Sequence, residues 1–118
     1  MLDDINVLKQ RDPSNALAVA AEQWKQVEFA AEVVDGDHDE RAITKVVVAG
    51  MGGSALAALL AKAWLDQTLT VPFEVVREYE LPAYVDASTL VIASSYSGNT
   101  EETVGVLADA QQKGAQVA

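Results

Sequence analysis

The sequence predicts an α/β fold in which a parallel β-sheet is covered by helices, forming a three-layer sandwich. Two observations support this class. Short apolar runs rich in Val, Ile and Leu alternate with longer runs of helical spacing, and two of the strand-like runs end in a glycine-serine turn that opens a helix. Units of this kind join parallel strands through right-handed crossovers. We expect a helical segment over residues 1–40 to precede this domain, which covers residues 41–118.

The N-terminal segment is predicted to hold one amphipathic helix over residues 15–34. Asp12-Pro13 is typical of a helix cap followed by proline in the first helical position. The apolar residues of the run recur at helical spacing, at Leu17, Ala20, Ala21, Trp24, Val27 and Ala31.

The next stretch, residues 35–41, is acidic and poor in apolar residues, so we expect a surface loop. It contains His38, the only histidine, and the carboxylates of Asp37 and Asp39. The loop offers no obvious partners for a catalytic histidine, and the spacing of a calcium loop is not completed downstream. No metal site is expected.

The domain itself shows four strand-like runs and two helix-like runs. The helix-like run over residues 54–65 is apolar around most of its circumference, which is typical of a helix that is buried or lies against a second subunit. Gly114 ends the other helix. The last four residues resemble the start of a further strand, so we expect the chain to be part of a longer protein. The predicted strands are 44–49, 72–77, 90–94 and 115–118, and the predicted helices are 54–65 and 100–113.

Composition limits the possible partners. The chain has 118 residues, half of them apolar, which is enough for one core. With 18 acidic and 8 basic residues, the net charge of −10 argues against nucleic acid or an anionic membrane as a partner. The absence of cysteine excludes disulfides, thiolate metal sites and a cysteine nucleophile, and it fits a cytoplasmic protein. We see no signal peptide and no apolar run long enough for a membrane anchor.

Two turns rich in glycine and serine, residues 50–54 and 94–100, carry the functional signal. Each follows an apolar strand-like run and opens a helix. The start of a helix presents unpaired N–H groups and the positive end of its dipole, so it is suited to binding an anion. Glycines allow close approach of the backbone. The hydroxyls of Ser54, Ser95, Ser97 and Thr100 can complete a phosphate site, although one serine or threonine alone is also a common helix cap.

Two other phosphate-binding motifs can be compared with these turns. Neither turn contains the Gly-Lys-Ser/Thr sequence of an NTPase loop. Gly50, Gly52 and Ala55 satisfy the dinucleotide pattern, and the glutamates that could contact a ribose are Glu74, Glu78 and Glu80. However, a dinucleotide fold does not require the second serine-rich turn, which favours a sugar phosphate.

The two turns, Gly-Met-Gly-Gly-Ser at 50–54 and Ser-Ser-Tyr-Ser-Gly-Asn-Thr-Glu-Glu-Thr at 94–103, resemble the sugar isomerase (SIS) domain family. They are most similar to the bifunctional phosphoglucose/phosphomannose isomerases of bacteria and archaea, and residues 77–82 also suit that subgroup. The resemblance implies a flavodoxin-like domain, truncated here. It assigns the substrate phosphate to Ser54, Ser95, Ser97 and Thr100, and places Gly52 and Gly53 near the sugar.

Members of this family carry two such domains, work as homodimers and need no cofactor. They interconvert aldose and ketose 6-phosphates of glycolysis and gluconeogenesis, with a glutamate moving a proton between C1 and C2 through a cis-enediol(ate). The resemblance places that glutamate and the ring-opening histidine beyond Ala118, so no catalytic residue is expected in this chain. Glu101 and Glu102 are interpreted as helix-start charges that face solvent.

Three hypotheses about function therefore remain. The first is a glucose 6-phosphate isomerase that also accepts mannose 6-phosphate. The others are a sugar-phosphate-sensing module of a regulator and an isomerase domain of the type that makes glucosamine 6-phosphate. Regulators usually place a basic helix-turn-helix before the domain, and the residues before Arg41 are not basic. Alone, the chain is expected to be inactive and marginally stable.

Overall fold

The structure, a computed structural model, describes residues 4–30, 32 and 39–118. It divides into two compact units, residues 1–36 and residues 37–118. Each unit is described by itself. His38 and Asp37 of the predicted acidic loop lie outside the described residues.

The N-terminal unit contains short helices instead of the predicted continuous one. These are α1 (Ile5–Arg11), α2 (Ala16–Ala21) and the 3-10 helix η1 (Gln23–Glu28). The prediction of one helix from residue 15 is therefore wrong in the described part of the run. The physical reason is the lack of packing: Leu17 and Trp24 remain exposed, and a short helix without a packed apolar face is marginal in water.

Asp12 caps α2 from further away than predicted. Pro13 lies in a turn and not in the first helical position. The Asp12 carboxylate accepts hydrogen bonds from the N–H groups of Ala16 and Leu17, at 2.8 and 2.9 Å. These bonds lower the pKa of Asp12.

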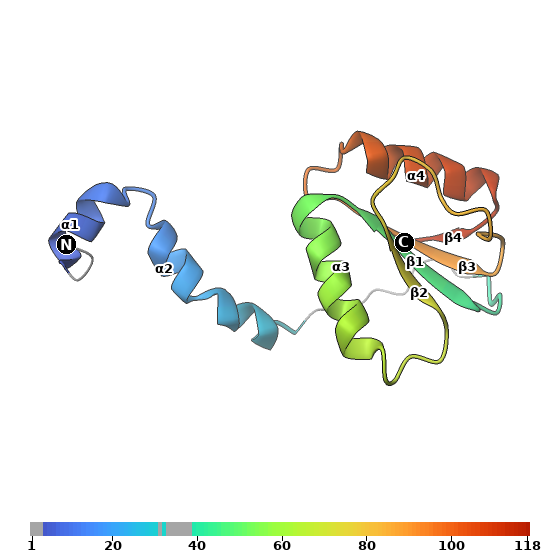
Figure 1. The fold of residues 1–118 in the computed structure, drawn as a ribbon, viewed down its shortest axis with the longest axis horizontal. Helices are drawn as coiled ribbons and strands as arrows, with labels where there is room; N and C mark the ends of the chain where they lie inside the picture. Colours follow the sequence, from blue (N-terminus) through green and yellow to red (C-terminus); the bar gives the residue numbers. More distant parts are fainter. Residues whose placement is uncertain (1–3, 31, 33–38) are drawn as a thin grey trace. The chain divides into compact units, whose positions relative to one another are not determined.

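The second unit is a parallel sheet of four strands in the order β2-β1-β3-β4 (Figure 1). This order matches the first four strands of a flavodoxin-like fold. Strand and helix bounds agree with the predicted ones to within a few residues. The strands are β1 (Lys45–Gly50), β2 (Phe73–Val76), β3 (Thr89–Ser94) and β4 (Gln116–Val117), and the helices are α3 (Gly52–Leu65) and α4 (Glu101–Gln112).

The two helices cover opposite faces of the sheet, as the three-layer prediction required (Figure 1). The chain steps from β1 to β2 in one direction across the sheet and from β3 to β4 in the other, so right-handed crossovers place α3 and α4 on different sides. On the α4 side, Val47 and Val91 pack with Val106 in one buried cluster. Val48 points to the other face, where Ala55 and Ala58 are the buried residues of α3.

Helix α3 is less buried than its apolar sequence predicts. Only small residues on one side of it are buried, and Leu56, Leu60 and Trp64 are 58%, 74% and 83% exposed. The sheet of this chain therefore covers only one side of the helix.

The loop between β2 and β3 is held against α4. The Asp109 carboxylate accepts a hydrogen bond of 2.8 Å from the N–H of Leu81. Leu81 and Val85 are buried in the α4-side cluster. At the end of α4, Gly114 has φ +69°, a conformation suited to glycine, and the chain turns there into β4. Among the described residues, no helix combines the length and the apolar composition needed to cross a membrane.

Candidate anion-binding site

The two glycine-serine turns lie side by side at the carboxyl edge of the sheet. Gly50 and Ser94, the last residues of β1 and β3, are paired partners in the parallel ladder. A Cβ added at Gly50 would lie 3.0 Å from the Ser94 carbonyl oxygen and 3.2 Å from the Ser54 Cβ. The absence of a side chain at Gly50 therefore allows the two turns to approach. Strand order reverses between β1 and β3, the point where open α/β sheets bind ligands.

Three hydroxyls of the second turn form a triangle. The Oγ of Ser95 lies 2.9 Å from the Oγ1 of Thr100 and 3.3 Å from the Oγ of Ser97, and Ser97 lies 3.3 Å from Thr100. The N–H groups of Gly98 and Asn99 donate to Ser95 and Ser97, at 3.1 and 3.3 Å. These two bonds fix the oxygens in place, while each hydroxyl hydrogen can rotate toward a ligand.

Both turns open into one pocket of about 720 Å³. All four hydroxyl residues predicted for the phosphate line it. Gly53 also lines it, whereas Gly52 does not and has φ +53°. Met51, Ala57 and Tyr96 line the pocket too and were not predicted, although all three lie in or next to the two motifs. The full lining is Met51, Gly53, Ser54, Ala57, Ser94, Ser95, Tyr96, Ser97 and Thr100.

The hydroxyls do not act as helix caps. Thr100 occupies the N-cap position of α4 but makes no side-chain bond to the helix, because its Oγ1 lies in the triangle. Ser54 lies within the first turn of α3, and the N-cap position of that helix is Met51, which also has no side-chain cap. Both helices therefore begin at this pocket without a side-chain cap on their N–H groups.

Among the residues that the structure describes, no lysine or arginine lines the pocket. Glu101 and Glu102 lie in the first turn of α4, the first exposed and the second partly buried. Their negative charges, Glu102 more than Glu101, raise the pKa of Tyr79. Thr103, in the same turn, is 6% exposed, and its hydroxyl has no hydrogen-bond partner among the described residues. An anion here would depend on N–H and O–H donors.

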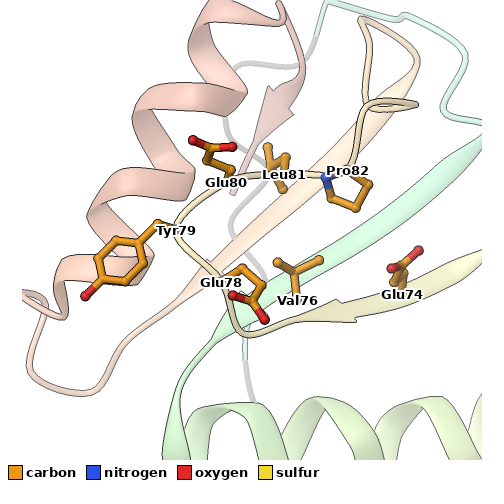
Figure 2. Close-up of a pocket in the computed structure, with 7 residues that line it drawn as sticks. All are labelled: Glu74, Val76, Glu78, Tyr79, Glu80, Leu81 and Pro82. Carbon is orange, nitrogen blue, oxygen red and sulfur yellow. The ribbon is translucent and has the colours of Figure 1, made fainter.

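A second pocket, of about 500 Å³, lies beyond the end of β2 and differs in charge (Figure 2). It contains the three glutamates that the dinucleotide pattern singled out. Figure 2 shows the carboxylates of Glu78 and Glu80 pointing in different directions. Glu74 accepts a hydrogen bond from the Tyr84 hydroxyl, and burial together with this carboxylate raises the pKa of Tyr84 to about 12. This lining repels an anion.

No group of three or more metal-ligating side chains converges within residues 4–30, 32 and 39–118. The described part of the chain therefore gathers hydrogen-bond donors at one pocket and offers no cage for a cation.

Comparison with known proteins agrees with this geometry. The family profile of the SIS domain matches residues 41–118. A bifunctional phosphoglucose/phosphomannose isomerase of Caldicellulosiruptor bescii is 53% identical over 75 residues, covering 64% of this chain and 22% of that protein. The enzyme of the same name from Thermoplasma volcanium is 40% identical over 92 residues, covering 78% of this chain and 28% of that protein.

A solved structure shares the fold. A Bacillus subtilis protein, assigned as a phosphosugar isomerase in its crystal structure, is 30% identical with a TM-score of 0.60, covering 66% of this chain and 25% of that one. The chain thus spans about a quarter of the length of the relatives it matches. On the family profile, the α/β fold and the two adjoining turns together, the chain belongs to the SIS domain family.

Proposed function

We propose that this chain forms the phosphate-binding part of a sugar-phosphate isomerase that interconverts glucose 6-phosphate and fructose 6-phosphate and also accepts mannose 6-phosphate. The observation that carries the proposal is the triangle of Ser95, Ser97 and Thr100 facing Ser54 across one pocket. The similarity to proteins named bifunctional phosphoglucose/phosphomannose isomerase supports the choice of substrate.

Binding of the phosphate follows from the donors of the pocket. In the free site the three hydroxyls bond to one another, and each can rotate its hydrogen onto a phosphate oxygen. The uncapped N-termini of α3 and α4 add N–H groups and the positive ends of two helix dipoles. Gly53, in the lining, and the adjacent Gly52 leave room for the sugar beside the phosphate.

In catalysis this site anchors the phosphate end of the sugar, which is remote from the reacting carbons. Binding energy at the phosphate fixes C1 and C2 in position for proton transfer. Glu101 and Glu102 are helix-start charges in the proposal and not the base, because neither lines the pocket. The base and the ring-opening histidine come from the rest of the protein. The whole protein works as a cytoplasmic homodimer, and the exposed apolar side of α3 supports burial against further protein.

Substitution of the hydroxyls tests the binding role. We expect Ser95→Ala and Ser97→Ala to weaken glucose 6-phosphate binding by about 1.5–3 kcal/mol for each lost bond, measured by titration calorimetry. Thr70→Ala is the matched control, because Thr70 is exposed and lies before β2, at the other edge of the sheet. Unchanged affinity in both serine variants would show that the phosphate does not bind in this pocket.

Turnover tests the reaction. A protein containing this chain together with the missing part of the relatives' length should convert glucose 6-phosphate and mannose 6-phosphate to fructose 6-phosphate in a coupled assay. Turnover of neither sugar, with phosphate binding intact, would favour a sensing module. Turnover only with an ammonia donor would favour the domain type that makes glucosamine 6-phosphate.

A further inference from the structure

The basic residues of the folded domain are distributed unevenly. Four of the five lie at the amino edge of the sheet, two because they precede or begin β1 and two because the helices of β-α-β units finish at that edge. One lies at the carboxyl edge, where the candidate site is. Those at the amino edge are Arg41, Lys45, Lys62 and Lys113, and the one at the carboxyl edge is Arg77.

Three of the four amino-edge cations already have carboxylate partners. Arg41 is paired with Asp39, Lys45 lies 2.8 Å from Asp86, and Lys113 lies 3.6 Å from Asp109. Carboxylates within the domain therefore neutralise these three charges, which leaves them less able to bind a ligand.

Arg77 is different. It is exposed, and among the contacts between described residues it has neither an ion pair nor a side-chain hydrogen bond. The cation at the edge that holds the site is thus available to a ligand.

The register of the sheet brings Arg77, which follows β2, level with the end of β1. Ala49 of β1 pairs with Val76 of β2, so the next residues, Gly50 and Arg77, lie level with each other on strands about 4.8 Å apart. A side chain at Gly50 would point at the first turn of α3, where Ser54 lies. Arg77 directly follows β2, and continuing the alternation of side chains by one residue past Val76 would put it on that same face, opposite the buried cluster that contains Val76.

Arg77 and the start of α3 both carry positive charge at this edge, although glutamates also flank Arg77 in the sequence. The N-terminus of α3 is the positive end of the helix dipole, and Arg77 adds a second positive charge on the same side of the sheet edge. A phosphate bound between them would be attracted by both positive groups, and a guanidinium can bond two phosphate oxygens at once.

We propose that Arg77 is the cationic ligand of the phosphate, bonding it from the β2 side while the hydroxyls and helix N–H groups hold it from the β1 and β3 sides. This inference rests on the proposed function and adds to it a residue that lies outside both glycine-serine turns. It also explains how a strongly acidic chain attracts a dianion to this edge.

The test is a set of titrations of the chain with inorganic phosphate and with glucose 6-phosphate at low and moderate salt. Arg77→Ala should weaken binding of both ligands by about tenfold and flatten the dependence of affinity on salt, since a charge-assisted bond is lost. Arg77→Lys should restore the salt dependence but only part of the affinity, because an ammonium is a point charge. Lys62→Ala, which removes the same charge from the far end of α3, should leave affinity unchanged.

The outcomes separate the two proposals. If Ser95→Ala weakens binding and Arg77→Ala behaves like Lys62→Ala, the role of Arg77 is overturned and the phosphate site stands. If Ser95→Ala has no effect either, the phosphate site itself is overturned. An equal loss in Arg77→Ala and Lys62→Ala would assign the effect to overall charge and also overturn the contact. A thermal melt of each variant confirms that it is folded.

Discussion

In the described part of the chain, Thr103 has a buried side-chain oxygen without a hydrogen-bond partner. Burying a hydroxyl without a partner costs about 1–3 kcal/mol in mutational data, and a methyl group of the same shape avoids that cost. We therefore expect Thr103→Val to raise the free energy of unfolding by about 1 kcal/mol in urea titrations. Because Thr103 does not line the pocket, phosphate affinity should not change.

Thr103→Ser is the matched control. It keeps the unpaired hydroxyl and removes a buried methyl group, so it should lower stability. A Val variant less stable than the original chain would show that the hydroxyl has a partner, such as a bound water, that offsets its burial.

At the residue scale, the sequence predicted the hydroxyls of the pocket because local spacing fixes most of their geometry. Ser95, Ser97 and Thr100 belong to one short turn, so a tight loop necessarily brings them together. Arg77 could not be found in this way. Its position depends on pairing between β1 and β2, which brings together residues 27 positions apart, as the Ala49–Val76 pair shows. A motif within one segment does not show which distant strand pairs with it.

At the element scale, the sheet was predictable and the N-terminal helix was not, because an apolar run folds as predicted only where it is buried. Strands such as Lys45–Gly50 are buried on both faces, and their continuous apolar runs report that burial directly. The run over residues 15–34 has helical spacing as well, but spacing alone does not supply a surface to pack on. In the described part of this run Leu17 and Trp24 are exposed, and the α-helix there is limited to Ala16–Ala21.

The α2 helix consequently depends on its cap. We expect Asp12→Ala to reduce the helical content of residues 16–21, because two N–H groups at the start of the helix lose their acceptor. Chemical shifts of the Cα atoms of these residues measure the loss. Asp4→Ala is the control, since Asp4 accepts from Asn6 and Val7 and caps α1 only. Equal loss of α2 in both variants would contradict the local role of Asp12.

At the scale of the whole molecule, charge opposes the fold. With 18 acidic and 8 basic residues, repulsion between carboxylates exceeds what a few exposed ion pairs return, because an exposed pair contributes only about 0–1 kcal/mol. If the pocket binds phosphate as proposed, it attracts a ligand of the same sign as the net charge of the chain, which repels that ligand. The fold separates these two roles in space. Hydrogen-bond donors for the ligand lie at the carboxyl edge of the sheet, and the cations that pair with carboxylates lie at the amino edge.

Salt should therefore raise the melting temperature. Potassium chloride screens the repulsion between carboxylates, and potassium sulfate at the same ionic strength should raise the melting temperature further, because sulfate also occupies the pocket and stabilises the folded state by mass action. Sulfate additionally strengthens burial in general, so the comparison that decides is with Ser95→Ala, which should keep the general increase and lose the specific one. A melting temperature that falls in chloride would mean that ion pairs outweigh the net charge of −10, and an equal sulfate increase in both proteins would leave the pocket without an anion.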